Sequence, residues 1–254
     1  MLRQRPPAAG LTVMLSILSL IWAPVARFLR RWLMGNELEK SLEKLHSLLD
    51  RHRTVGAALY DDCEGHLFPC DGLAMTALDR SLNHVEGFLL LMRNHGYICS
   101  AALLRIQLDC ILRLYGVMNS DDPHGVAVAV LQGERLDQIK DRHGKQMRDS
   151  HLLELLEPKN PGVTRIYRWA SGYVHFSREH VSHFLARSVP GKDGRRVFQI
   201  GNNDDHIPLE HRRELADGFA TVTRGVLGVI EKWTAGRRNV ASREELHRRF
   251  TAPI

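Results

Sequence analysis

The sequence has few cysteines, few aromatic residues and few stretches in which β-branched residues alternate with polar ones. Its four cysteines form no C-x-x-C pair, the spacing that structural zinc sites and thioredoxin-type redox motifs prefer. A strand followed by a glycine-rich turn and a helix is also missing, which excludes P-loop and Rossmann nucleotide-binding enzymes. We therefore expect a helical protein with reduced cysteines that uses no metal ion and no cofactor.

The basic charge of the chain lies at its two ends. The formal net charge is +6, but residues 1–35 contain five arginines and no acidic residue, and residues 237–254 contain five arginines against two glutamates. The body between them, residues 36–236, is slightly acidic. Because binding to duplex DNA usually requires a clustered basic surface, no duplex-DNA partner is expected.

Residues 1–35 form an apolar and basic leader. The stretch 11–22 is strongly apolar, and the stretch 27–33 is basic and amphipathic, which is typical of segments at a membrane surface. Three interpretations stay open: an anchor that contacts the membrane through residues 11–33, a leader that precedes the true start at Met34, and a secretion signal. An anchor of this charge would keep the following domain cytoplasmic, so we expect a cytoplasmic protein, with or without membrane attachment.

Apolar residues recur at three- and four-residue intervals through most of the remaining chain, which predicts amphipathic helices. The expected helices cover 37–58, 71–95, 97–118, a segment that begins at Pro123, 152–157, 167–175, 208–234 and a short segment after Ser242. Residues 183–189 and 196–200 instead resemble two strands around a turn. The expected fold is mainly α, an antiparallel helical bundle with one small β-hairpin insertion near 184–200.

Polar residues mark several helix ends. Asp71 is expected to cap the second helix, Asp122 the helix that begins at Pro123, and Asp149 or Ser150 the short helix after it. The sequence thus predicts one helical domain over residues 36–236, followed by a basic tail over residues 237–254 with a short helix. A homodimer is left open.

The segment from Tyr167 onward carries the densest set of reactive side chains in the chain. If it is helical, Tyr167, Ser171 and His175 fall on one stripe, and Arg168 lies about 20° from His175 around the axis. Aromatic residues that suit the wall of a pocket accompany them, namely Trp169, Tyr173 and Phe176. This segment is the candidate site.

Two enzyme classes do not fit the segment. The spacing of His175, His180 and His183 matches neither H-E-x-x-H nor H-x-x-E-H, so a zinc site is not expected. Ser171 is not part of a G-x-S-x-G turn, so a serine hydrolase is not expected either.

Arg168 followed by His175 resembles the R-x(4–6)-H motif of the HEPN superfamily, whose members are compact helical bundles and often metal-independent endoribonucleases. The resemblance implies that Arg168 holds an RNA phosphate and that His175 acts on the 2′-hydroxyl or on the leaving group. Histidine suits this task because its pKa lies near neutrality. On this interpretation Arg168 and His175 are catalytic.

A second resemblance covers residues 85–200. The helix with Arg105 and Asp109, and the motif that contains Tyr167, Ser171 and His180, are similar to those of uncharacterised bacterial helical proteins, some of them abortive-infection-like. This resemblance adds Tyr167, Ser171, Arg105, Asp109 and His180 as candidate binding residues but implies no reaction.

The alternative to a nuclease is a non-catalytic module that binds RNA or a small ligand. On that interpretation the Tyr167, Ser171 and His175 stripe is a polar network that fixes the packing of the helices. Arg105 and Asp109, one turn apart, would then be an ordinary helix ion pair.

Overall fold

The computed structural model describes residues 35–64, 66–198, 200–201, 206–236 and 243–250. Over this part of the chain the fold is mainly α, as predicted, with one small antiparallel hairpin. The predictions for the stretch 11–33, for a start at Met34 and for a cap at Ser242 lie outside the described residues.

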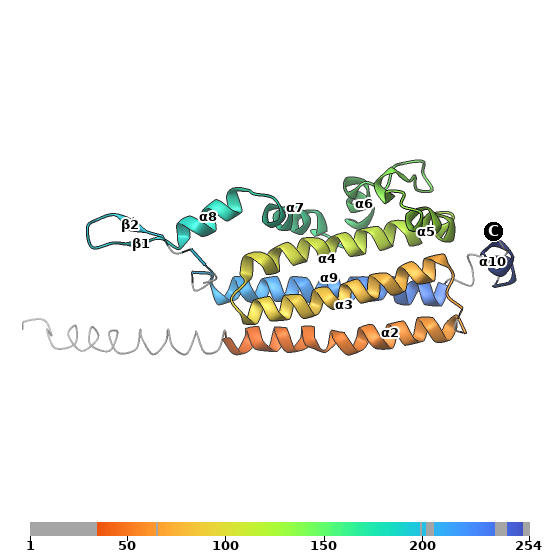
Figure 1. Ribbon diagram of the computed structural model, residues 1–254, viewed down its shortest axis with the longest axis horizontal. Coiled ribbons are helices and arrows are strands. Elements are labelled where there is room, and N and C mark those ends of the chain that lie inside the picture. Colours follow the sequence, from red (N-terminus) through yellow and green to blue (C-terminus); the bar gives the residue numbers. More distant parts are fainter. Residues whose placement is uncertain (1–34, 65, 199, 202–205, 237–242, 251–254) are drawn as a thin grey trace, which may run out of the picture.

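Four long helical segments run side by side and form the bundle in Figure 1. Residues 35–46 are helical and a turn at Ser47 leads into α2, Leu48–Asp62. The other three are α3, Pro69–Arg93, α4, Tyr97–Met118, and α9, Leu209–Gly236. Because only residues 94–96 join α3 to α4, these two helices are antiparallel neighbours, and α9 packs against α2, α3 and α4.

The core lies between these helices and follows their apolar stripes. The rings of Phe88 and Phe219 stack at its centre with their centroids 4.0 Å apart, and neither is exposed to solvent. Such a stack contributes roughly 0.5–1.5 kcal/mol beyond the burial of its surface. It joins α3 directly to α9 through two residues that are 131 positions apart in the chain.

Shorter helices form a second layer, with α6 and α7 against α4 and α5 against α3 and α4, and this layer carries the candidate site (Figure 1). It consists of α5, Pro123–Leu131, a 3-10 turn, Leu136–Gln138, α6, Asp149–Leu156, and α7, Val163–Val174. A small apolar cluster around Leu112, Met147 and Leu152 attaches α6 to α4.

The capping predictions have mixed outcomes. Asp122 caps α5 as expected, because its carboxylate accepts the backbone N–H of Gly125 at 3.0 Å. Asp71 lies inside the first turn of α3 rather than before it, and its carboxylate accepts the N–H of Phe68 at 3.1 Å. The prediction for Asp149 or Ser150 was wrong, because α6 begins at Asp149 and no side chain caps it.

An arm of residues 175–198 projects from one end of the bundle (Figure 1). It contains α8, Arg178–Ala186, and two short strands, β1, Val189–Pro190, and β2, Arg196–Val197, which pair antiparallel. The hairpin was predicted, but a strand from His183 was wrong, because residues 183–186 belong to α8. The helix forms because the Ser177 hydroxyl caps it by accepting the N–H of Glu179.

At the opposite end of the bundle lies α10, Arg243–Phe250, where Arg249 forms an ion pair with Asp122. None of the helices in the described part of the chain is both long and apolar enough to cross a bilayer.

Candidate functional site

Helix α7 separates two groups of side chains along its two edges. At about 100° per residue, Tyr167 and Ser171 lie on the edge that faces α6, while Trp169 and Tyr173 lie on the other edge. Ala170, between them, is fully buried. The polar stripe and the aromatic stripe that the sequence placed in one site therefore belong to two different environments.

The predicted stripe breaks at His175. Helix α7 ends at Val174, and His175 has an extended backbone with φ −99° and ψ 147°. The chain leaves the helix there because the Ser177 hydroxyl donates a hydrogen bond to the carbonyl of Gly172 at 2.6 Å. His175 therefore does not share a helical face with Tyr167 and Ser171, and that prediction was wrong.

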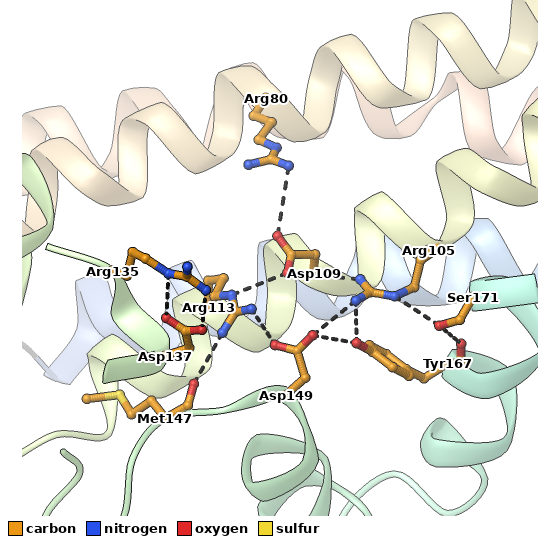
Figure 2. A network of polar contacts seen from close by, with 10 residues as sticks. All are labelled: Arg80, Arg105, Asp109, Arg113, Arg135, Asp137, Met147, Asp149, Tyr167 and Ser171. Atoms are coloured by element: carbon orange, nitrogen blue, oxygen red, sulfur yellow. Dashed lines mark hydrogen bonds and ion pairs between the residues drawn. The ribbon is translucent and has the colours of Figure 1, made fainter. Parts of the chain in front are cut away.

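Tyr167 and Ser171 are part of a network centred on Asp149, shown in Figure 2. The carboxylate of Asp149 accepts hydrogen bonds from Arg105 at 3.0 Å, from Arg113 and from the Tyr167 hydroxyl. Arg105 also donates to the Ser171 hydroxyl at 3.2 Å, and its guanidinium carbon lies 3.9 Å from the centre of the Tyr167 ring. The network thus joins α4, α6 and α7.

Asp109 closes the network on the α4 side. It lies 4.0 Å from Arg105, the expected helix pair, and 3.2 Å from Arg113. Two carboxylates thus lie against two guanidinium groups, and the four side chains are 17–31 % exposed. Because these charges satisfy one another, the network has the properties of a structural element rather than of an open catalytic centre.

The Tyr167 phenol is held in its protonated form. Burial raises its pKa to about 12, and the hydrogen bond to Asp149 acts in the same direction. It therefore donates to the carboxylate at neutral pH and is not available as a general base.

The two predicted catalytic residues lie outside this network. Arg168 is exposed on α7 and His175 is exposed after its end. Among the described residues neither forms a hydrogen bond with the other. His180 lies on α8, away from the network, where its ring is 6.2 Å from that of Tyr173 and 6.1 Å from that of Phe176. The structure therefore brings together Tyr167, Ser171, Arg105 and Asp109, but not Arg168, His175 and His180.

The aromatic edge of α7 lines a cavity of about 650 Å³ between α4, α7, α8 and α9. Its inner wall is apolar and aromatic, with Tyr97, Leu104, Tyr173, Ile207 and Leu215 buried. The remaining lining residues are Arg165, Ile166, Trp169, His183, His211, Glu214 and Gly218. Cavities of this size and lining suit small organic ligands.

His183 forms one wall of the cavity and is held by hydrogen bonds at both ring nitrogens. One nitrogen lies 3.0 Å from the Tyr173 hydroxyl and the other 3.3 Å from His206. Burial raises the pKa of Tyr173, so its hydroxyl also stays protonated at neutral pH. These contacts fasten α8 to α7 and fix the imidazole at the edge of the cavity.

Sequence reasoning missed several residues of this region. Asp149 and Arg113 both belong to the network. The sequence indicated only that Asp149 caps a helix and that Arg113 lies within one, because the two residues meet only when α6 packs against α4. A signal for the cavity was present in the spacing of Ile166, Trp169 and Tyr173, which places three large side chains on one edge of α7.

The chain matches no protein-family model, no curated protein and no solved structure. Among the described residues, no three histidine, cysteine or acidic side chains are grouped so that they could hold a metal ion.

Proposed function

We propose that the protein is a binding module whose ligand is a small organic molecule with a flat, largely apolar ring system. The aromatic cavity between α4, α7, α8 and α9 carries this proposal. Its volume lies within the usual range for ligand sites, and its apolar inner wall with a few polar groups is their usual composition. The network around Asp149 supports the wall by fixing the position of α7.

The arrangement of the lining residues indicates how such a ligand would lie. Trp169 and Tyr173, with ring centroids 4.8 Å apart, offer aromatic faces and edges to the ring system. Arg165, His211 and Glu214 are exposed and supply hydrogen-bonding groups at the mouth. A ligand would place its rings against the inner wall and its polar substituent at the mouth.

A pair of glycine substitutions tests the cavity without disturbing the core. A Cβ added at Gly218 or at Gly228, both on α9, would meet no atom within 4 Å. Gly218 lines this cavity, whereas Gly228 lines a separate hollow of about 470 Å³ between α4 and α9. Gly218→Leu should therefore fill the cavity, whereas Gly228→Leu is the matched control.

The probe is anilinonaphthalene sulfonate, a flat aromatic molecule with one polar group, and binding is measured by fluorescence and calorimetry. The unsubstituted protein and the Gly228→Leu variant should both bind the probe at a site where the Gly218→Leu variant does not bind it. Equal binding by both variants would show that the cavity is not a ligand site.

A metal-independent endoribonuclease is the second candidate, as the HEPN resemblance implies. The observation that favours it is that Arg168 and His175 are both exposed and outside the polar network, and hence available to a substrate. If this candidate is right, the protein cleaves RNA in the presence of a chelator. Arg168→Ala and His175→Ala should then each abolish cleavage and leave the melting temperature unchanged. If the protein is instead a binding module, neither the unsubstituted protein nor either variant cleaves RNA.

A further inference from the structure

The arm of residues 175–198 is the most apolar exposed surface among the described residues. It holds half of the large apolar side chains that are exposed there, including Phe176, which is 91 % exposed. No residue of α8 is buried, and both hairpin strands are exposed along their length. Monomeric soluble proteins rarely expose a large apolar patch unless it binds a partner or a membrane. We therefore expect this surface to bind one of these.

Two apolar side chains of α8, those of Val181 and Leu185, point away from the bundle. The inner side of the helix is defined by His183, which contacts Tyr173 and His206. Val181 and Leu185 each lie about 160° from His183 around the helix axis. They are 45 % and 51 % exposed, so the bundle does not cover this outer face.

Contacts within the arm hold this face in place. The rings of Phe184 and Phe198 stack almost parallel with their centroids 4.9 Å apart, which fastens the hairpin to α8. Arg196 donates to the hydroxyl and to the carbonyl of Ser188 at 2.7 and 3.2 Å. These contacts fix the hairpin relative to α8, and they thereby fix the positions of the exposed apolar side chains of the arm.

The arm is also basic, and its charge selects the kind of occupant. It contains five basic residues, Arg178, Arg187, Lys192, Arg195 and Arg196, against two acidic residues, Glu179 and Asp193. A second copy of the chain would bring the same positive charges face to face, which opposes association. An anionic lipid surface instead attracts the basic residues and accepts the apolar ones.

The position of the arm agrees with a membrane surface. The first described helix begins at residue 35 at the same end of the bundle from which the arm projects (Figure 1). The residues that precede it include the apolar and basic stretch 11–33. Two segments of this composition are thus attached to one end of the molecule.

We propose that the arm docks on the surface of an anionic lipid bilayer, with Val181 and Leu185 at the acyl boundary and the basic residues of the arm at the headgroups. The docking face lies on the side of α8 opposite His183, which lines the cavity, and the proposal does not depend on a ligand there. Because the docking is partly electrostatic, it weakens as the salt concentration rises.

The test is hydrogen exchange of the full-length protein with vesicles of phosphatidylcholine alone or of phosphatidylcholine mixed with phosphatidylserine. Because this measurement reports each segment separately, binding through residues 11–33 cannot mimic binding through the arm. Exchange in residues 175–198 should slow with the anionic vesicles, much less with the neutral ones, and less again in high salt.

A double variant and a matched control complete the test. The double variant Val181→Ser with Leu185→Ser should bind the anionic vesicles about tenfold more weakly, as measured by the slowing of exchange in the arm. The reason is that two apolar side chains are lost from the interface with the lipid. Leu90→Ser with Leu131→Ser removes two leucines that are 65 % and 67 % exposed on the bundle, and it should change nothing. The proposal is overturned if anionic vesicles do not slow hydrogen exchange in the residues of the arm. Protection that needs no lipid and grows with protein concentration overturns it as well, in favour of a dimer.

Discussion

The indole of Trp233, near the end of α9, donates a hydrogen bond of 2.8 Å to the buried carboxylate of Asp71, near the start of α3. The second oxygen of Asp71 accepts the backbone N–H of Phe68 at 3.1 Å. One side chain thus holds the beginning of one bundle helix to the end of another, across 162 positions of sequence.

Removing this carboxylate should destabilise the bundle. Asp71→Ala leaves two buried N–H donors without their acceptor, and we expect a loss of about 2–3 kcal/mol in the free energy of unfolding. The same substitution at Asp79, exposed on the same helix, is the control and should have little effect. Urea unfolding followed by circular dichroism measures both. Equal losses would show that the buried contact is not important for stability.

The network of Figure 2 gives a second prediction. In Asp149→Asn, the guanidinium groups of Arg105 and Arg113 lose a partner in a site where Asp149 is 26 % exposed. Partly buried charges without a partner are unfavourable, so we expect a loss of about 2 kcal/mol in the free energy of unfolding.

The control for this variant is Asp50→Asn. Asp50 forms an ion pair of 2.8 Å with Arg53, and the two side chains are 86 % and 61 % exposed. Pairs of this kind contribute little in water, so no measurable change is expected. If the two variants lose the same stability, the network does not act as a structural element.

The third prediction concerns alkaline pH. Burial and the bond to Asp149 raise the pKa of Tyr167 to about 12 in the folded protein, against about 10 in an unfolded chain. Since the folded state holds the proton more tightly, the resulting stability is complete below about pH 10 and is lost as the pH rises toward about 12. The unsubstituted protein should therefore lose more stability across this window than Tyr167→Phe does.

Urea midpoints at several pH values measure this difference. The raised pKa of Tyr173 affects both proteins equally and cancels in the comparison. Parallel curves for the two proteins would contradict the prediction. A titration of phenolate absorbance in both proteins gives an independent value for Tyr167.

The fourth prediction uses two glycines of α9. A Cβ at Gly225 would lie 2.6 Å from the terminal carbon of Ile111, whereas a Cβ at Gly228 would meet nothing within 4 Å. Gly228→Ala should therefore raise the free energy of unfolding by about 0.5–1 kcal/mol through helix propensity. Gly225→Ala should be less stable than Gly228→Ala by about 0.5–1 kcal/mol, because the terminal carbon of the partly buried Ile111 side chain must move aside. Thermal unfolding of both variants decides the matter, and equal stability would mean that the two helices do not approach as closely as described.

The sequence predicts the bundle well because its helices are long and strongly periodic. Helix α4 begins and ends where the spacing of its leucines indicated, at Tyr97 and Met118. The segment around Ser177 could not be predicted in the same way. Its hydroxyl both ends α7 and begins α8, and a single polar side chain leaves almost no periodic signal.

The candidate site was only partly predictable for a similar reason. The i,i+4 spacing of Arg105 and Asp109 is visible in the sequence, and their contact with Tyr167 and Ser171 depends on how α7 packs on α4. That packing is decided by apolar contacts such as the buried Ala170, and no sequence motif specifies it. The HEPN interpretation of Arg168 and His175 stays a prediction, since their roles depend on an RNA substrate.

The imidazole of His183 belongs to two parts of the molecule at once, because it lines the cavity and also holds α8 against Tyr173. If the arm docks on lipid and that docking changes the position of His183, it would also change one wall of the cavity. If the cavity then binds a ligand, thermodynamic linkage would require the two sites to affect each other equally. The factor by which the lipid surface changes the affinity of the cavity would be the factor by which the ligand changes the affinity of the arm for lipid.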